Sequence, residues 1–416
     1  MKKGGEAMAK VFSGSMITSI DIGTTKICVM IARRLSEERV EIVGVGNSPS
    51  HGLERGVVVD IAKTVQSIRN AVAEAQLMAD YEIVEAIIGI SGSHIQSFNS
   101  SGAVPIKRGA IGDDDVAAVL ESAQAVSIEQ GQKVLHVLPQ YFVVDGNRVD
   151  QPLGLHGIRL EAVVHVITGA ISSIQNLVTC CESAGIKVCD IVLEQLASAA
   201  GVLSRDEKIL GVGVLDIGGG TSDFAIYQSG SIRYTRVFPI AGNMFTRDLA
   251  VGLRATIQDA ERVKCNYGSV FLDQQAEEII DIETVQGNIQ EQTSRGEITY
   301  ILQARAQELL LLLDHELEKS DLKNMMIAGL VITGGGSLLK GIDELAKNIL
   351  SLPVRIGRPQ TEDMLPDSLK SPKYATGFGL LKYALQMSKK HSMMNMEGTL
   401  ATRVLMRVRS WVADFF

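Results

Sequence analysis

Short apolar runs alternate with segments of helical periodicity along most of the chain. Residues 16–22 and 27–32 have the continuous apolar character of buried strands, whereas residues 61–79 repeat their apolar positions with the period of an amphipathic helix. Such alternation is typical of an α/β protein, in which helices cover sheets. The pattern therefore predicts an α/β fold.

One motif of a strand followed by a turn occurs twice in the sequence. The first copy, residues 19–26, reads Ser-Ile-Asp-Ile-Gly-Thr-Thr-Lys, and the second, within residues 213–227, contains Leu-Asp-Ile-Gly-Gly-Gly-Thr-Ser-Asp. Each copy has a strand, then Asp-Ile-Gly, then hydroxyl residues and a second strand. We interpret the repeat as an internal duplication, which predicts two related domains that face each other.

The remaining segments lie around these two copies. Residues 246–322 are largely helical and polar, with an apolar stripe at Ile301, Leu309, Leu310, Leu312 and Leu313, and a helix is expected at 113–127. The predicted division is a first domain (16–90), an insertion (91–166), a return to the first domain (167–208), a second domain (209–245), a helical insertion (246–322), a return through both domains (323–387), a linker (388–398) and a terminal helix (399–416).

Composition narrows the class of protein. Lys and Arg number 40 against 48 Asp and Glu, a net charge of −8, and 46% of residues are hydrophobic. These values describe an acidic globular protein without the basic excess that nucleic-acid binding uses, so we set nucleic acid aside. The 5 cysteines lack metal-ligand spacing and predict reduced thiols in the cytoplasm.

The repeated turn suits a nucleoside triphosphate for a chemical reason. Glycine lets backbone N–H groups approach phosphate oxygens, hydroxyls add donors, and an Asp can hold Mg²⁺ through water. One such turn is common for turn chemistry alone. Two copies, together with the strand 327–332 and the triple-glycine turn 333–337, indicate a nucleoside triphosphate site more specifically.

These motifs resemble the ATPase superfamily of actin, Hsp70 and the sugar kinases, whose five motifs are found here in order. Residues 20–26 resemble phosphate-1, 191–199 connect-1, 215–223 phosphate-2, 331–338 the adenosine motif and 375–380 connect-2. The resemblance implies an actin-like two-domain fold with ribonuclease H-like halves and ATP·Mg²⁺ in the cleft between them.

The resemblance also implies a role for each motif residue. Asp21 and Asp216 would hold Mg²⁺ through water, and Glu261 and Lys264 on one helix face would contact the ribose, although a solvated salt bridge is the alternative for that pair. Glu194, with Gln195 beside it, would position the attacking water of an ATPase that is at most slow. The other nucleotide contacts would be Gly23, Thr24, Thr25, Lys26, Gly218, Gly219, Gly220, Thr221, Gly334, Gly335, Gly336 and Ser337.

The last seventeen residues predict an amphipathic helix after the linker. Its length of roughly 27 Å is too short to cross a bilayer, and its only Trp stands opposite the arginines, which favours a helix lying in an anionic membrane surface. Docking on the body of the protein or in a partner's groove are the alternatives. The residues assigned to the membrane are Leu400, Val404, Leu405, Val408, Trp411, Val412, Phe415 and Phe416 on the apolar face, with Arg403 and Arg407 opposite.

The combination resembles the bacterial actin-like cell-division family FtsA, with further family signatures at 52–61, 90–95 and 241–243. The resemblance implies an adaptor at midcell, on the cytoplasmic face of the inner membrane, that tethers the FtsZ ring and self-associates into filaments. It implies that 91–166 is subdomain 1C, which meets later division proteins. It implies that 246–322 is subdomain 2B, where Arg305 meets the FtsZ C-terminal peptide. The alternative is the related actin-like pilus-assembly adaptor ATPase.

Overall fold

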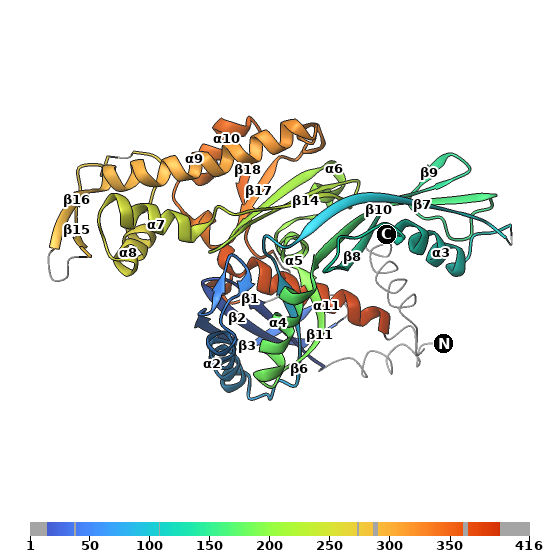
Figure 1. The fold of residues 1–416 in the computed structure, drawn as a ribbon, viewed down its shortest axis with the longest axis horizontal. Coiled ribbons are helices and arrows are strands. Elements are labelled where there is room, and N and C mark those ends of the chain that lie inside the picture. Colours follow the sequence, from blue (N-terminus) through green and yellow to red (C-terminus); the bar gives the residue numbers. More distant parts are fainter. Residues whose placement is uncertain are drawn as a thin grey trace.

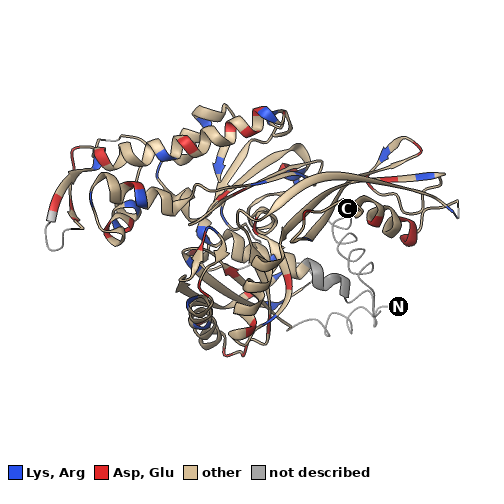
Figure 2. Cartoon of the chain, viewed as in Figure 1, with Lys and Arg blue, Asp and Glu red and all other residues tan. Residues whose placement is uncertain are grey.

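Two five-stranded sheets, one in each half of the molecule, dominate the computed structural model (Figure 1). The structure describes residues 15–36, 39–107, 109–272, 274–285, 290–360 and 365–391. Figure 2 shows acidic and basic residues interspersed over both halves.

The first sheet has the strand order β11–β6–β1–β2–β3. Its strands are β1 (Met16–Ile22), β2 (Lys26–Arg34), β3 (Val40–Pro49), β6 (Glu85–Ile90) and β11 (Lys187–Leu193), and a small hairpin of β4 (Leu53–Glu54) and β5 (Val57–Val58) precedes the first helix. Helices α2 (Ile61–Ala79) and α4 (Ile171–Ser183) share one core with this sheet, and α11 (Ala375–His391) packs on Cys28 and Met30 of the other face. The predicted strand 16–22 and helix 61–79 are confirmed.

The second sheet repeats the first. Its order is β14–β13–β12–β17–β18, and its central strand, like β1, has an antiparallel neighbour on one side and a parallel neighbour on the other. Its strands are β12 (Val212–Ile217), β13 (Ser222–Gln228), β14 (Ser231–Phe238), β17 (Leu330–Thr333) and β18 (Val354–Ile356). Asp21 and Asp216 are each the penultimate residue of the central strand, so the predicted duplication is present in three dimensions.

One hydrophobic core joins the second sheet to the helices beyond it. Leu309, Leu310 and Leu313 of α9 are fully buried there, as the apolar stripe predicts, but Leu312 is 41% exposed and does not belong to it. The segment 246–322 also contains a β-hairpin, which the sequence analysis missed. The hairpin consists of β15 (Ile279–Glu283) and β16 (Gln290–Ser294), and the helices here are α7 (Gly242–Gly252), which begins just before the segment, α8 (Ile257–Tyr267) and α9 (Arg295–Lys319). Outside the segment, α6 (Arg205–Leu210) precedes β12 and α10 (Ile342–Leu350) lies between β17 and β18.

A third, four-stranded sheet is inserted between β6 and α4 and has its own core. Figure 1 shows it projecting away from the first sheet beside β14. Its helix ends at Gln124, earlier than the expected residue 127. The elements of this insert are β7 (Gln96–Pro105), α3 (Asp113–Gln124), β8 (Gln132–Val144), β9 (Asn147–Val149) and β10 (Arg159–Ala170). After the insert, α4 and β11 lead to α5 (Glu194–Val202).

Helix α11 continues to His391, past the point at which the linker was expected to begin. The rest of the expected linker and the whole terminal helix, 399–416, lie outside the described residues. Among the described helices, none combines the length and apolar character needed to cross a bilayer. Short 3₁₀ turns are η1 (Lys323–Met325), η2 (Gly335–Leu338), η3 (Asp367–Leu369) and η4 (Pro372–Tyr374).

Helices α5 and α11 approach each other so closely that their contact requires glycine. A Cβ atom added at Gly379 would overlap the carbonyl oxygen of Ala197. We predict that Gly379→Ala lowers the free energy of unfolding by roughly 3 kcal/mol, because the helices must separate, although alanine favours a helix. Urea unfolding measures this. Gly335→Ala, which meets no atom within 4 Å, is the matched control, and equal midpoints for the two variants would contradict the close packing.

Candidate functional site

The two repeated hairpin turns have the same backbone geometry and meet between the halves. Gly23 N donates to Lys26 O at 3.0 Å, and Gly218 N donates to Thr221 O at 2.9 Å. A Cβ atom added at Gly219 would lie 2.5 Å from Thr25 Oγ1. The turns are therefore in direct contact, and the structure brings together the glycines and threonines of both predicted phosphate loops.

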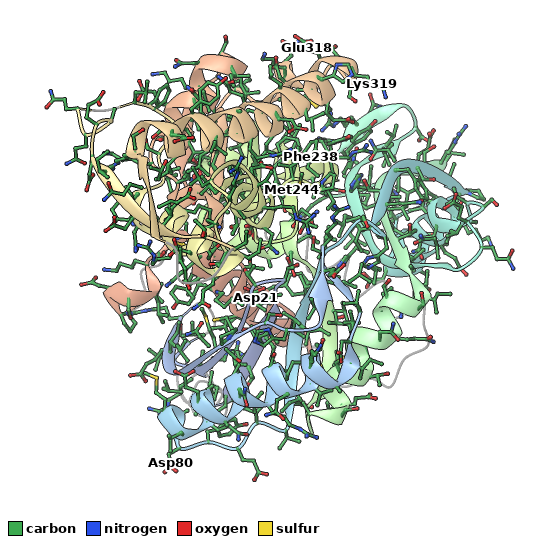
Figure 3. All side chains as sticks on the ribbon, turned by 60° about the vertical axis from the view of Figure 1, so that its left-hand side comes forward. Asp21, Asp80, Phe238, Met244, Glu318 and Lys319 are labelled. Carbon is green, nitrogen blue, oxygen red and sulfur yellow. The ribbon has the colours of Figure 1, made fainter. Side chains whose placement is uncertain are left out.

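Three buried carboxyl groups and a half-buried one lie behind these turns. Asp21 and Asp216 are next to last in β1 and β12, Asp223 is second in β13 directly opposite Asp216, and Glu194 begins α5. Figure 3 shows Asp21 at the boundary between the two halves. Like charges directly opposite each other in a sheet destabilise it, so this placement is costly unless a cation or protons are bound.

Burial dominates the titration of this carboxyl cluster. It raises the pKa of Asp21 to about 6, with Lys26 acting against it and Asp216 acting with it. It raises the pKa of Asp223 to about 7 and that of Glu194 well above its usual range, each with help from neighbouring carboxylates. The pKa of Asp216 also rises by burial, although two hydroxyl donors oppose the shift. Four ionised carboxylates here would therefore carry more negative charge than the groups around them neutralise.

Hydroxyl donors on α5 and α11 fix Asp216 of the second sheet. Thr376 Oγ1 donates to Asp216 Oδ2 at 2.9 Å, and Ser198 Oγ donates to the same oxygen. Gly334, at the end of β17, has φ of 82° and lies so close that a Cβ atom there would overlap Asp216 Oδ1. Only glycine fits this position, and the third predicted loop is thereby placed beside the two hairpins.

Lys26 links the first hairpin to η4, the turn that precedes α11. Its Nζ lies 4.0 Å from Asp21 Oδ2, donates to Lys373 O at 2.8 Å and sits 4.6 Å from the centre of the Tyr374 ring. A single lysine accompanies four carboxyl groups, and it is already shared with a backbone carbonyl and an aromatic face. It cannot neutralise the cluster alone.

Glu261 and Lys264 pair on α8, as the helical spacing predicts. Lys264 Nζ donates to Glu261 Oε2 at 2.7 Å, to Thr246 Oγ1 at 2.8 Å and to Gly242 O at 3.2 Å. Gly242 N in turn donates to Gly218 O at 2.9 Å. Through α7, this pair is connected to the second hairpin, while the Glu261 side chain is exposed, as the alternative of a solvated salt bridge also expects.

The triple-glycine turn forms η2. Gly336 packs on Ile217, whereas a Cβ atom at Gly335 would meet nothing within 4 Å, so this residue faces open space. Ser337 Oγ donates to Gly334 O at 2.7 Å and is buried, so its hydroxyl stabilises the turn itself. The open side of the turn lies at Gly335.

Arg305 is not a free surface cation. Its Nε and Nη2 donate to the two carboxylate oxygens of Asp248 at 2.5 and 2.9 Å, and Nη1 donates to Glu308. An acidic peptide at this position must share or displace these partners.

Sequence reasoning missed several residues of the site. Asp223 stood in the quoted hairpin without a role, yet it accepts hydrogen bonds from Gln195 Nε2 at 2.8 Å and Ser91 Oγ at 2.5 Å. The β-hairpin register, which pairs Asp223 with Asp216, was the available signal. Ser198 and Thr376 stand in the segments that resemble connect-1 and connect-2, but the sequence analysis gave neither residue a role.

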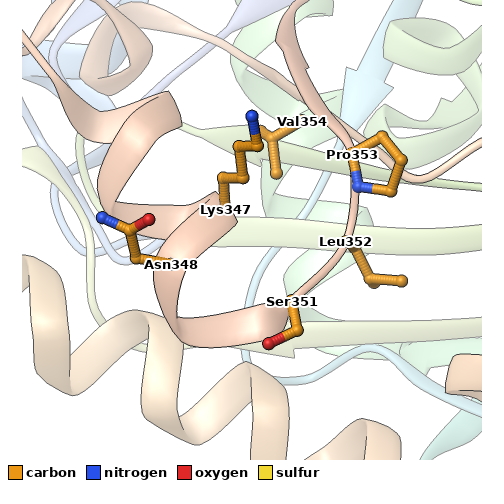
Figure 4. Close-up of a pocket in the computed structure, with 6 residues that line it drawn as sticks. All are labelled: Lys347, Asn348, Ser351, Leu352, Pro353 and Val354. Atoms are coloured by element: carbon orange, nitrogen blue, oxygen red, sulfur yellow. The ribbon is translucent and has the colours of Figure 1, made fainter.

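The described part of the chain shows no second candidate site. No three His, Cys, Asp or Glu side chains among the described residues are grouped to chelate a metal directly. A surface pocket of ≈ 650 Å³ lies where α10 meets β18 (Figure 4), and none of the predicted nucleotide contacts lines it. Its lining residues are Lys347, Asn348, Ser351, Leu352, Pro353 and Val354.

Comparison with solved structures places the fold. The chain aligns with a PilM–PilN type IV pilus biogenesis complex at a TM-score of 0.65, with 16% identity over 89% of this chain and 98% of that one. It aligns with MreB5 of Spiroplasma citri bound to ADP at a TM-score of 0.57, with 18% identity over 92% of this chain and 99% of that one. These likenesses confirm an actin-like fold.

Comparison at the sequence level is more specific. The chain is 43% identical to the cell division protein FtsA of Pseudomonas aeruginosa over 98% of this chain and 100% of the relative, and 36% identical to that of Bacillus subtilis over 91% and 85%. Family models match residues 213–379, as cell division protein FtsA, and residues 92–168, as the SHS2 domain inserted in FtsA. The chain belongs to the cell division protein FtsA family.

Proposed function

We propose that the chain is an ATP-binding adaptor of the division machinery, which holds ATP·Mg²⁺ between its halves and tethers the FtsZ ring to the cytoplasmic membrane at midcell. The observation that carries the nucleotide proposal is the meeting of two equivalent hairpins, with Asp21 and Asp216 at equivalent positions, beside the Gly334 turn. The solved MreB5 relatives, described as bound to ADP or AMPPNP, support a nucleotide in this fold.

The residues present fit ATP·Mg²⁺. Glycines at both hairpins leave backbone N–H groups accessible to phosphate oxygens, and the excess of buried carboxyls calls for a cation. ATP·Mg²⁺ would supply that cation together with phosphate oxygens that bridge the halves. Asp21 and Asp216 would orient the metal's water ligands, and Glu261, Lys264 and the Gly335 side of η2 would receive the nucleoside.

The nucleotide serves this adaptor as a conformational ligand more than as a substrate. Each half contributes one hairpin, so a ligand that binds both favours the closed arrangement. Glu194 is the proposed water-positioning residue of a slow hydrolysis, but its raised pKa favours the protonated form, which is a poor base. Hydrolysis is therefore secondary in this proposal.

The adaptor role rests on family membership and on the terminal residues. We assign the membrane contact to the helix predicted at 399–416, which lies outside the described residues, the FtsZ C-terminal peptide to the 246–322 region with Arg305, and later division proteins to the insert. Self-association would multiply weak membrane contacts. The pilus-assembly alternative is not retained, because its solved relative shares 16% identity and shows the fold alone.

A substitution of Asp216 tests the proposed cation site. Asp216→Asn removes one charge beside the proposed metal, and we expect it to weaken ATP binding in the presence of Mg²⁺ at least about tenfold, roughly 1.4 kcal/mol. Titration with a fluorescent ATP analogue, with Mg²⁺ and with EDTA, measures this. Asp206→Asn, at an exposed position on α6, is the control. An unchanged affinity, or equal affinities in Mg²⁺ and EDTA for the unaltered chain, would contradict the metal placement.

A substitution of Trp411 tests the proposed membrane contact. Trp411→Glu places a charge on the apolar face of the proposed helix, so co-sedimentation with vesicles containing anionic lipid is expected to fall to the level of a chain ending at His391. Thr402→Glu adds the same charge on the polar face and is expected to retain most of the binding. If the truncated chain pellets as well as the full chain, the terminal helix is not the membrane contact.

A further inference from the structure

The insert is connected in sequence to the first half of the molecule, but it packs along the second half. It begins after β6 and ends before α4, both elements of the first half, whereas its strands lie against β14, the edge strand of the second sheet (Figure 1). Ser97 Oγ donates to Thr235 O at 3.1 Å, and His165 Nε2 and Thr235 Oγ1 share a hydrogen bond of 3.0 Å. Thr235 lies in the middle of β14.

A second group of contacts continues this boundary. Gln140 and Arg233 bind each other twice, from Arg233 Nη1 to Gln140 Oε1 at 3.3 Å and from Gln140 Nε2 to Arg233 O at 3.5 Å. Ser231 Oγ donates to Gln140 O at 3.1 Å. We call these residues the polar seam; it consists of Ser97, Asn99, Gln140 and His165 on the insert and Ser231, Arg233 and Thr235 on β14.

Separating the two sides of the polar seam is unfavourable in free energy. His165 is 2% exposed, and both its ring nitrogens are used, one toward Thr235 and the other toward Asn99 Oδ1 at 2.7 Å. Burial lowers the pKa of His165 to about 4, so the ring stays neutral at physiological pH. Arg233 and Arg148 lie over the ring of Tyr141, next to Gln140. Separating the surfaces would leave several buried polar groups without their present partners, which is unfavourable.

The root of the insert is held differently. Ser91, directly before the insert, donates to Asp223 Oδ1 at 2.5 Å, and Gln195 Nε2 donates to the same oxygen at 2.8 Å. On the first half, Leu193 N donates to His136 Nε2 at 3.1 Å. Gly92 follows Ser91 with φ of 136°, a conformation that other residues rarely adopt. Apolar contacts add to these bonds, because Leu135 belongs to the core of the first half and Leu138 and Ile167 pack with Leu193. The root is therefore held to the first half by few hydrogen bonds, by apolar packing and by one permissive residue.

We propose that the insert and the second half move as one body, and that the Ser91–Asp223 hydrogen bond is the latch that couples this body to the nucleotide site. The proposal rests on the proposed nucleotide function for its physiological trigger. Separation of the two halves must break either the polar seam or the root, and the root holds fewer hydrogen bonds to the first half than the seam holds to β14. Opening therefore releases Ser91 and carries the insert away from the first half.

Asp223 makes the latch sensitive to the site's contents. Its carboxylate belongs to the buried cluster, and Gln195, which is fully buried, has an Oε1 atom without a hydrogen-bond partner in that same place. A cation in the cluster changes the charge that Ser91 and Gln195 contact. Occupancy of the site is thus transmitted to the outer face of the insert, where a partner protein can bind it.

Distances between spin labels test the proposal. Labels carried on an introduced ketone-bearing residue are placed at exposed positions on the insert (Glu121), the first half (Gln66) and the second half (Glu344). Upon saturation with ATP·Mg²⁺, the Glu121–Gln66 distance is expected to shift by several ångströms while the Glu121–Glu344 distance stays constant. Nucleotide binding is measured on the same samples.

A second arm needs no nucleotide. Ser91→Ala is expected to broaden the Glu121–Gln66 distribution and to leave Glu121–Glu344 narrow, whereas Ser101→Ala, at an exposed position on β7, changes neither. Broadening of Glu121–Glu344 instead, or no change in either distance, would overturn the moving body. If ATP fails to bind, the proposed function fails, and the Ser91→Ala arm still decides this inference.

Discussion

The gathering of four carboxyl groups, three of them buried, between two halves of the chain is the interaction on which the rest of the structure depends. Asp21, Asp216, Asp223 and Glu194 come from both sheets and from the helix that joins them, and Lys26 is the one cation beside them in the part of the chain that the structure describes. Because the folded state raises their pKa values, it binds more protons than the unfolded state, so stability falls as pH rises from the ordinary pKa of 3.8 to the folded values of about 6 for Asp21 and about 7 for Asp223. A bound cation removes this penalty only when the halves are together.

Small residues and hydroxyls make that closed arrangement sterically possible. Gly334 admits Asp216, Gly379 admits Ala197, and the two hairpins meet through glycine and threonine. Thr376 and Ser198 extend the contacts of Asp216 to α11 and α5. Since α11 leads toward the terminal segment and Ser91 leads into the insert, the carboxyl cluster lies at the junction of every part to which we assign a partner.

Local pattern predicted the repeated features of the fold well and the singular ones poorly. The strand at 16–22, the helix at 61–79 and the duplication follow from hydrophobic period and from a motif that occurs twice. The β15–β16 hairpin interrupts a segment whose helical signal dominated, and Leu312 continues a leucine run that turns away from the core. The register of β12 with β13 could have identified Asp223, but the contacts of Ser91, Ser198 and Thr376 depend on how distant segments fold together.

The most direct test of the carboxyl cluster counts the protons released when ATP·Mg²⁺ binds. Calorimetric titrations at neutral pH in buffers of different ionisation enthalpy give this number. Because a cation favours the ionised carboxylates, the account predicts a net release of protons, diminished in Asp223→Asn. Binding without proton release, or with the same release in that variant, would contradict the claim that the buried carboxyls form the cation's site.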